Sequence, residues 1–172
     1  FDYVAFVDEN FIAPARDQGP EKSMLILGAG GFTIGRTDIK NKYVYVDIDS
    51  ALKDVAERQF LKENLTPNKT FIPMDARAFL IQSQEKYDFI LVDLFRDPVS
   101  MPENVITREF FEEVKKHLAP GGVMAANVFA SAVFADDYSR NIDATLRAVF
   151  PVLNRQVVQP FSAWAARDKS WR

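Results

Sequence analysis

The fold of this chain is decided by one stretch, Met24-Leu25-Ile26-Leu27-Gly28-Ala29-Gly30-Gly31, in which four apolar residues run directly into a glycine-rich turn. A short apolar run that ends in glycines is typical of a buried strand. Glycines at the end of a strand reach positive φ angles at little cost and let the backbone approach a ligand closely. The stretch therefore predicts the first strand of an α/β sheet with a ligand site at its carboxyl end.

Working outward, strands are predicted at 43–48, 70–74, 87–93 and 123–128, because these runs are apolar and rich in β-branched or aromatic residues. Helical spacing predicts helices from 49 or 50 to 63, from 76 to 84, from 107 to 118 and from 136 to 150. Residues 32–42 leave room for only a short helix. Alternating strands and helices predict a doubly wound, Rossmann-like α/β sheet that is mostly parallel.

Two further strands are predicted near the end of the chain, at 152–158 and 163–167. No helix separates them, so we expect them to pair as an antiparallel C-terminal hairpin. The expected sheet then has about seven strands. A dinucleotide-binding domain has a similar α/β sheet but usually lacks such a hairpin, so the hairpin argues against a dinucleotide-binding function.

The composition indicates an ordinary globular domain: 172 residues, 48% hydrophobic and 26% charged, with a net charge of −3. Nucleic acid is not expected as a partner, because phosphate contacts need clustered Lys and Arg. The sequence has no cysteine and one histidine, so neither a disulfide nor a structural zinc site is expected. That histidine, His117, is expected on the surface near a helix end.

The chain begins at Phe1 inside an apolar stretch. We expect residues 1–21 to be a lead-in segment that remains from a longer chain, and residues 22–172 to form the nucleoside-binding domain. The missing N-terminal region could add a domain or a membrane anchor. Within the given sequence, no segment approaches the ~18 apolar residues that cross a bilayer. The expected location is the cytoplasm, and a homodimer is a possible assembly.

Asp47 ends the second strand, 19 residues after Gly28, where an acidic residue can accept hydrogen bonds from ribose hydroxyls. Helix capping is the alternative role for an aspartate here, and we favour it for Asp49. The full dinucleotide fingerprint requires glycine at position 33, where this chain has Thr33. The turn and Asp47 together favour a site for an adenosyl group.

Three more aspartates lie at or after predicted strand ends, where a parallel sheet forms its ligand crevice. Asp75 can accept from an adenine amino group, with Ala76 adding a backbone contact, or it can cap the next helix. Asp93 and Asp97 can hold a cationic substrate, and one of them can take a proton from an attacking amine. A solvated loop carboxylate is the alternative role for both, and for Asp97 a turn former before Pro98 is another.

Taken together, these motifs resemble the spermidine synthase family and, more loosely, the class I methyltransferases. The resemblance runs from about Lys22 to Ala130. It rests on the glycine stretch and on six further segments: Tyr45-Val-Asp-Ile-Asp, Asp75-Ala-Arg-Ala-Phe-Leu, Tyr87-Asp-Phe-Ile-Leu-Val-Asp, Asp97-Pro-Val, Thr107-Arg-Glu-Phe-Phe, and Leu118-Ala-Pro-Gly-Gly-Val.

The resemblance implies a site for S-adenosylmethionine or its decarboxylated form, with a small-molecule amine or another acceptor as partner. It implies that Asp97 is the base that deprotonates the amine and that Asp93 is its companion carboxylate. The cofactor-binding set that it implies is Gly28, Ala29, Gly30, Gly31, Asp47, Ile48, Asp75, Ala76 and Asp93.

The sequence departs from the family pattern in the glycine turn, where Gly31-Phe32-Thr33 stands in place of an acidic residue near the donor's amine. The family's tyrosine-glutamate motif before the first strand is not evident, and Asp8 is the nearest acidic candidate. Three functions therefore stay open: aminopropyl transfer to an amine, methyl transfer from ordinary S-adenosylmethionine, and a catalytically inactive binding module.

Overall fold

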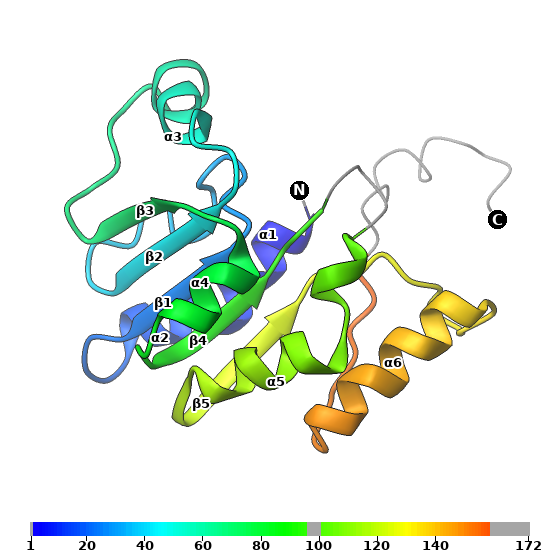
Figure 1. Ribbon diagram of the computed structural model, residues 1–172. Coiled ribbons are helices and arrows are strands. Elements are labelled where there is room, and N and C mark those ends of the chain that lie inside the picture. The colour runs from blue at the N-terminus through cyan, green and yellow to red at the C-terminus, as the bar shows by residue number, and fades with distance from the viewer. Residues whose placement is uncertain (1, 96–100, 159–172) are drawn as a thin grey trace, which may run out of the picture.

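The computed structural model describes residues 2–95 and 101–158, and its centre is one parallel β-sheet. The strands are β1 (Ser23–Leu27), β2 (Lys42–Asp47), β3 (Lys69–Pro73), β4 (Tyr87–Val92) and β5 (Leu118–Ala126). Their order is β3-β2-β1-β4-β5, and every neighbouring pair is parallel (Figure 1). The predicted α/β, Rossmann-like architecture is confirmed.

Helices cover both faces of the sheet, with α4, α5 and α6 on one face and α1 and α2 on the other (Figure 1). Because both faces are covered, the central strands bury nearly every residue, as β1 does from Met24 to Leu27. Leu25 and Leu27 pack against the first layer, whereas Met24 and Ile26 pack against the second. The bounds are α1 (Asp2–Val7), α2 (Ala13–Asp17), α3 (Leu52–Val55), α4 (Ala76–Gln82), α5 (Arg108–Lys116) and α6 (Asp137–Val149).

The N-terminal residues 2–17 form a continuous helical lead-in, in which the π-helix η1 (Asp8–Ile12) joins α1 to α2. This segment packs on the sheet, since Ile12 is fully buried and the Phe11 ring stacks on Phe89 with 5.0 Å between centroids. The sequence division at residue 21 stays a prediction.

Three helices begin at the predicted positions, and at each of them a side chain caps the first turn. Asp75 accepts from the Ala78 amide at 2.9 Å, and Thr107 accepts from the Phe110 amide at 3.2 Å. Asp136 accepts from the Ser139 amide at 2.7 Å. These caps confirm the predicted starts of α4, α5 and α6.

The prediction of a short helix within 32–42 is wrong, because these residues form turns. Phe32 and Gly35 have φ angles of 54° and 67°, outside the right-handed helical region. The Asp38 carboxylate also binds the amides of Lys40 and Asn41, which offers the backbone an alternative to helical bonds.

The helix expected from 49 or 50 to 63 is divided into α3 and the π-helix η2 (Ala56–Leu61). Within these two helices the apolar residues Val55 and Phe60 are exposed, whereas Leu61 is buried. The i→i+5 hydrogen bonds of a π-helix widen each turn and rotate the following side chains relative to α-helical spacing.

The fifth strand starts earlier than predicted, at Leu118, and a register irregularity separates its first pair with β4 from the rest. His117, expected on the surface, is buried. Its ring nitrogens lie 2.8 Å from the Glu113 carbonyl oxygen and 3.1 Å from the Ser83 carbonyl oxygen, so the ring is enclosed between α5 and the residue that follows α4.

The strand predicted at 152–158 is absent, and Val152 is 86% exposed there. A strand needs a ladder partner, and the described part of the chain offers this segment none. The predicted partner at 163–167 lies outside the described residues, so the closing hairpin stays a prediction. Across residues 2–95 and 101–158, no helix is both long and apolar enough to cross a membrane.

Candidate active site

The glycine turn after β1 lies between the carboxyl ends of β2 and β4, the two strands that flank β1. The Gly28 amide donates to the Val46 carbonyl of β2 at 2.8 Å, and the Asp93 amide donates to the Leu27 carbonyl at 2.8 Å. Gly28 has a φ angle of +94°, and a Cβ there would lie 2.0 Å from the Asp93 carbonyl oxygen. Only glycine therefore allows the turn to lie this close to the end of β4.

Asp47, at the end of β2, is held against the same turn. Its Oδ2 accepts from the Ala29 amide at 3.0 Å, and its Oδ1 accepts from the Asp49 amide at 3.1 Å. Each carboxylate oxygen has about two acceptor positions, so one on each stays available to a hydroxyl. Asp49 Oδ1 accepts from the Ala51 amide at 3.0 Å and closes a turn just before α3, but Ala51 is the N-cap residue of that helix, so the predicted capping role of Asp49 is wrong.

The surroundings of the turn fit an adenosyl group. Gly30 has a φ angle of +49°, and a Cβ there would meet no atom within 4 Å, so open space lies above it. Ile48 follows Asp47 with 76% of its surface exposed and offers an apolar wall. An open backbone turn, a carboxylate and an exposed apolar side chain suit the sugar and base of a nucleoside.

Asp75 follows β3, and the Met74 amide donates to the Asp47 carbonyl at 2.9 Å. The structure thus brings Asp75 to the same edge of the sheet as Asp47. Asp75 forms the helix cap that the sequence offered as its alternative role, and Ala76 is buried at the start of α4. Contact of either residue with adenine stays a prediction.

Asp93, directly after β4, is held by two side chains that are distant from it in the sequence, one from α1 and one after β5. The Tyr3 hydroxyl of α1 donates to its Oδ2 at 2.8 Å, and the Asn127 amide nitrogen donates to its Oδ1 at 3.0 Å. Both donors are neutral. The carboxylate is therefore oriented by hydrogen bonds, and no cation among the described residues pairs with it.

Burial raises the pKa of the Asp93 carboxyl, and the hydrogen bonds from Tyr3 and Asn127 only partly oppose this rise. Burial, together with the negative charge of Asp93, also raises the pKa of the Tyr3 hydroxyl, which therefore stays a donor. A half-buried carboxylate with a raised pKa is better suited to accept a proton than a solvated one.

Sequence reasoning missed Tyr3 and Asn127. Asn127 directly follows β5, and the rule that strand ends line the crevice could have found it. Tyr3 lies 90 residues from Asp93, and no spacing within the lead-in indicates the contact. Asp97, the predicted base, lies outside the described residues.

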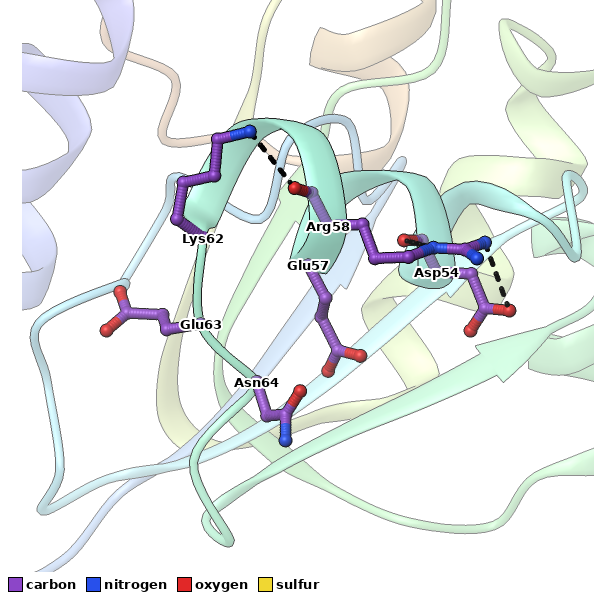
Figure 2. Close-up of a pocket in the computed structure, with 6 residues that line it drawn as sticks. All are labelled: Asp54, Glu57, Arg58, Lys62, Glu63 and Asn64. Atoms are coloured by element: carbon purple, nitrogen blue, oxygen red, sulfur yellow. Dashed lines mark hydrogen bonds and ion pairs between the residues drawn. The ribbon is translucent and has the colours of Figure 1, made fainter.

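A surface hollow lies elsewhere, over α3 and η2, and Figure 2 shows its charged lining. Its lining residues are Asp54, Glu57, Arg58, Lys62, Glu63 and Asn64. None of them belongs to the predicted set. Arg58 pairs with Asp54 at 3.7 Å within the hollow, whereas Glu57 and Glu63 pair with Lys53 and Arg36, which do not line it. Within the part of the chain that the structure describes, no three potential ligands gather as a metal site would require.

The fold places the chain in a class, the Rossmann-like α/β proteins with the methyltransferase fold. Human methyltransferase-like protein 13, solved with SAH, superposes with a TM-score of 0.71 at 21% identity, covering 90% of this chain and 74% of that one. A probable spermidine synthase from Corynebacterium glutamicum gives a TM-score of 0.71 at 24% identity, covering 88% and 55%. At these identities the likeness concerns the fold.

Within that class, the chain belongs to the spermine/spermidine synthase domain family, which matches residues 13–160. It is 33% identical over 150 residues to a probable polyamine aminopropyl transferase of Bifidobacterium longum, covering 84% of this chain and 32% of the relative. It is 38% identical over 112 residues to putrescine N-methyltransferase 2 of Nicotiana tabacum, covering 61% and 31%. The chain thus spans about a third of the length of these relatives.

Proposed function

We propose that this chain carries the donor site and the base of a spermidine synthase-like transferase, which moves an aminopropyl group from decarboxylated S-adenosylmethionine to a small amine. The observation that carries the proposal is the Asp93 carboxylate, fixed beside the glycine turn and raised in pKa by burial. The family match and the aminopropyl transferase relative support it.

In the proposed reaction, the acceptor amine loses a proton to Asp93 and its nitrogen lone pair attacks the carbon next to the donor sulfonium. The new C–N bond forms as the C–S bond breaks, and the electron pair of that bond neutralises the sulfur. The products are the aminopropylated amine and methylthioadenosine. Because the sulfonium is already a good leaving group, the chain contributes mainly positioning and base assistance.

The donor would lie along the glycine turn, with its ribose hydroxyls on Asp47 and its base beside Ile48 and Asp75. Gly28, Ala29, Gly30 and Gly31 would border its sugar and methionine-derived chain, and Ala76 would add a backbone contact to the base. These placements are proposals. They rest on the shared edge of the sheet, the open space over Gly30 and the exposure of Ile48.

Methyl transfer from ordinary S-adenosylmethionine is the second candidate, and Gly31 favours it. A glycine at this point places no acidic side chain near the donor tail, so a donor carboxylate is not repelled there. A Cβ on Gly31 would also lie 3.0 Å from the Phe60 ring, which leaves little room for a larger residue. The Nicotiana putrescine N-methyltransferase relative agrees with this alternative.

The test is a transfer assay with putrescine and each donor in turn, with release of methylthioadenosine or S-adenosylhomocysteine as the readout. We expect methylthioadenosine from the decarboxylated donor, and a loss of roughly 100-fold or more in kcat/KM for Asp93→Asn. Asp97→Asn, run in parallel, tests the base that the sequence resemblance implied. Glu63→Gln, an exposed acid outside the site, is the control.

Three outcomes would contradict the proposal in different ways. Turnover with ordinary S-adenosylmethionine alone would favour the methyltransferase. Loss of activity in Asp97→Asn but not in Asp93→Asn would identify Asp97, not Asp93, as the base. Absence of turnover with either donor, in protein that still binds methylthioadenosine, would leave the inactive binding module. The cytoplasmic location and the homodimer stay predictions from the sequence.

A further inference from the structure

We propose that Asn127 is a positioning residue that holds the Asp93 carboxylate in the orientation needed to take a proton from the acceptor amine. This inference rests on the proposed function, because it assigns a role relative to the proposed base. It starts from the hydrogen bond of 3.0 Å between the Asn127 amide nitrogen and Asp93 Oδ1.

Asn127 is carried by a rigid part of the fold. Its backbone amide donates to the Val92 carbonyl at 2.9 Å, one residue beyond the paired stretch of β4 and β5. Val92 directly precedes Asp93, so the residue that donates to the carboxylate is anchored to the strand that carries it. Side chains supported in this way keep their geometry better than side chains on loops.

The chemistry of the pair fixes the direction of the hydrogen bond. An ionised carboxylate only accepts, so the Asn127 side chain must turn its NH2 group, not its carbonyl oxygen, toward Asp93. Tyr3 holds the other carboxylate oxygen at 2.8 Å. With one donor on each oxygen, the carboxylate cannot rotate without losing a hydrogen bond, and one acceptor position per oxygen stays open for the amine.

The neutrality of Asn127 matters as much as its position. A Lys or Arg at this place would pair with Asp93 and lower its basicity. From the elements packed around Asp93, α1 contributes Tyr3, the glycine turn contributes the backbone of Gly28, and the end of β5 contributes Asn127. Of these three contacts only Tyr3 is titratable, and its raised pKa keeps it protonated near neutral pH.

The test compares Asn127→Leu, which keeps the side-chain size but removes the donor, with Asn127→Asp, which places a second carboxylate beside the first. Losing a hydrogen bond to the ionised form should move the acid limb of the kcat/KM profile up by about one pH unit in Asn127→Leu. Asn127→Asp should move it further, because the two negative charges repel. Misplacement of the base should also reduce kcat/KM by roughly 10-fold to 100-fold.

Asn64→Leu is the matched control, because Asn64 is exposed and lies away from Asp93, and its profile should match the unmodified chain. A second readout does not depend on turnover: an NMR titration of ¹³C-labelled aspartate carboxyls, with the Asp93 signal assigned by Asp93→Asn. The Asp93 midpoint should rise in Asn127→Leu by the same amount as the acid limb.

The two readouts separate the two proposals. An unmodified chain without transferase activity contradicts the proposed function, while the titration still tests the contact between Asn127 and Asp93. An unmodified chain that is active, with a folded Asn127→Leu variant whose acid limb and Asp93 midpoint are unchanged, overturns the positioning role. A purely structural role for Asn127 would lower the unfolding midpoint without moving either quantity.

Discussion

Gly28 and Gly30 both have positive φ angles, but they differ in what surrounds them. A Cβ on Gly28 would lie 2.0 Å from the Asp93 backbone, whereas a Cβ on Gly30 would point into open space. Gly28→Ala should therefore destabilise the fold by about 3 kcal/mol, from left-handed strain plus a backbone clash. Gly30→Ala should cost only ~1–2 kcal/mol, from strain alone.

Urea unfolding of both variants checks this difference, and titration with methylthioadenosine adds a second comparison. Gly30→Ala should lose more affinity than its small loss of stability suggests, because its methyl group enters the space proposed for the adenosyl group. Equal destabilisation of the two variants would mean that the turn relaxes away from Asp93. Unchanged affinity in Gly30→Ala would contradict the proposed donor position.

The predicted site residues that the structure brings to one edge of the sheet are those at fixed places in a repeating pattern. Asp47, Asp75 and Asp93 each lie at the end of a predicted strand, and parallel strands bring their carboxyl ends to one edge. Tyr3 could not be found in this way. Its contact with Asp93 depends on how the lead-in packs across the sheet, which no local spacing encodes.

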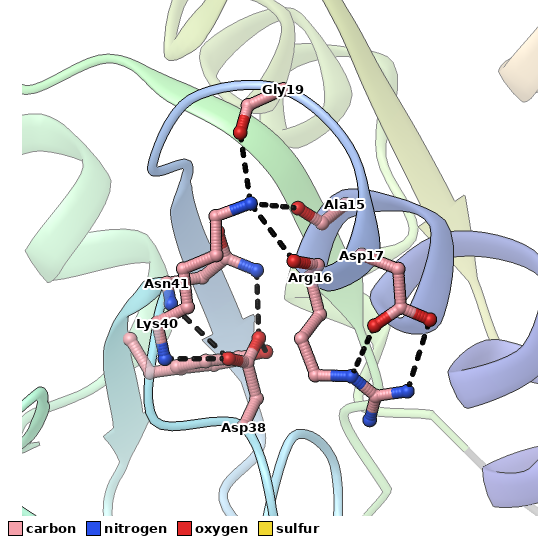
Figure 3. A network of polar contacts seen from close by, with 8 residues as sticks. Ala15, Arg16, Asp17, Gly19, Asp38, Lys40 and Asn41 are labelled. Carbon is pink, nitrogen blue, oxygen red and sulfur yellow. Dashed lines mark hydrogen bonds and ion pairs between the residues drawn. The ribbon is translucent and has the colours of Figure 1, made fainter.

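At the scale of elements, Lys40, in the turn segment before β2, holds the end of the helical lead-in (Figure 3). Its Nζ donates to the Arg16 carbonyl at 2.8 Å and to the Gly19 carbonyl at 2.9 Å, and it lies 3.5 Å from the Ala15 carbonyl. The last carbonyls of a helix have no partner within the helix, so a lysine that donates to them stabilises its end. Because α1 carries Tyr3, these hydrogen bonds also support the site.

Lys40→Met keeps most of the side chain's length but removes the donors, so it should loosen the lead-in selectively. Amides of residues 2–17 should exchange roughly 10-fold faster in hydrogen-exchange measurements, while amides of the central strands change little. Transferase activity should fall as Tyr3 loses its fixed position. Lys53→Met is the control, since the Lys53 side chain is 44% exposed and its Nζ lies 3.9 Å from Glu57 Oε1 in an i,i+4 pair. Uniformly faster exchange would indicate global destabilisation instead.

Helices were predictable where apolar residues recur at helical spacing over several turns and a capping residue directly precedes them. In α5, Thr107 caps the start, and the buried residues are Phe110, Phe111 and Val114. They were not predictable where tertiary contacts decide. Residues 32–42 form turns around the buried Asp38, which accepts from the Tyr43 hydroxyl at 2.7 Å and from the Asn41 amide group at 2.7 Å. A single aspartate in a polar stretch gives no sign of such a network.

At the scale of the whole molecule, strand order places the site. β1 lies between β2 and β4, so the glycine turn has Asp47 on one side and Asp93 on the other. The chain passes from β1 to β2 on one side and returns to β4 on the other, and ligands bind α/β sheets where the order reverses in this way. The alternation of strands and helices in the sequence predicted the parallel sheet. Whether further strands pair at the edge beyond β5 depends on long-range contacts, which local sequence patterns do not determine.

If this edge of the sheet holds an adenosyl group, methylthioadenosine should stabilise the whole fold by mass action. At 100 times its dissociation constant, a ligand that binds only the folded state adds about 2.7 kcal/mol. For a chain of this size, that should raise the melting temperature by roughly 5–10 °C. Asp47→Asn should remove most of the shift by weakening the ribose contact, and Asp54→Asn, in the hollow of Figure 2, should keep it. A larger shift with NAD than with methylthioadenosine would instead indicate a dinucleotide site, which Thr33 argues against.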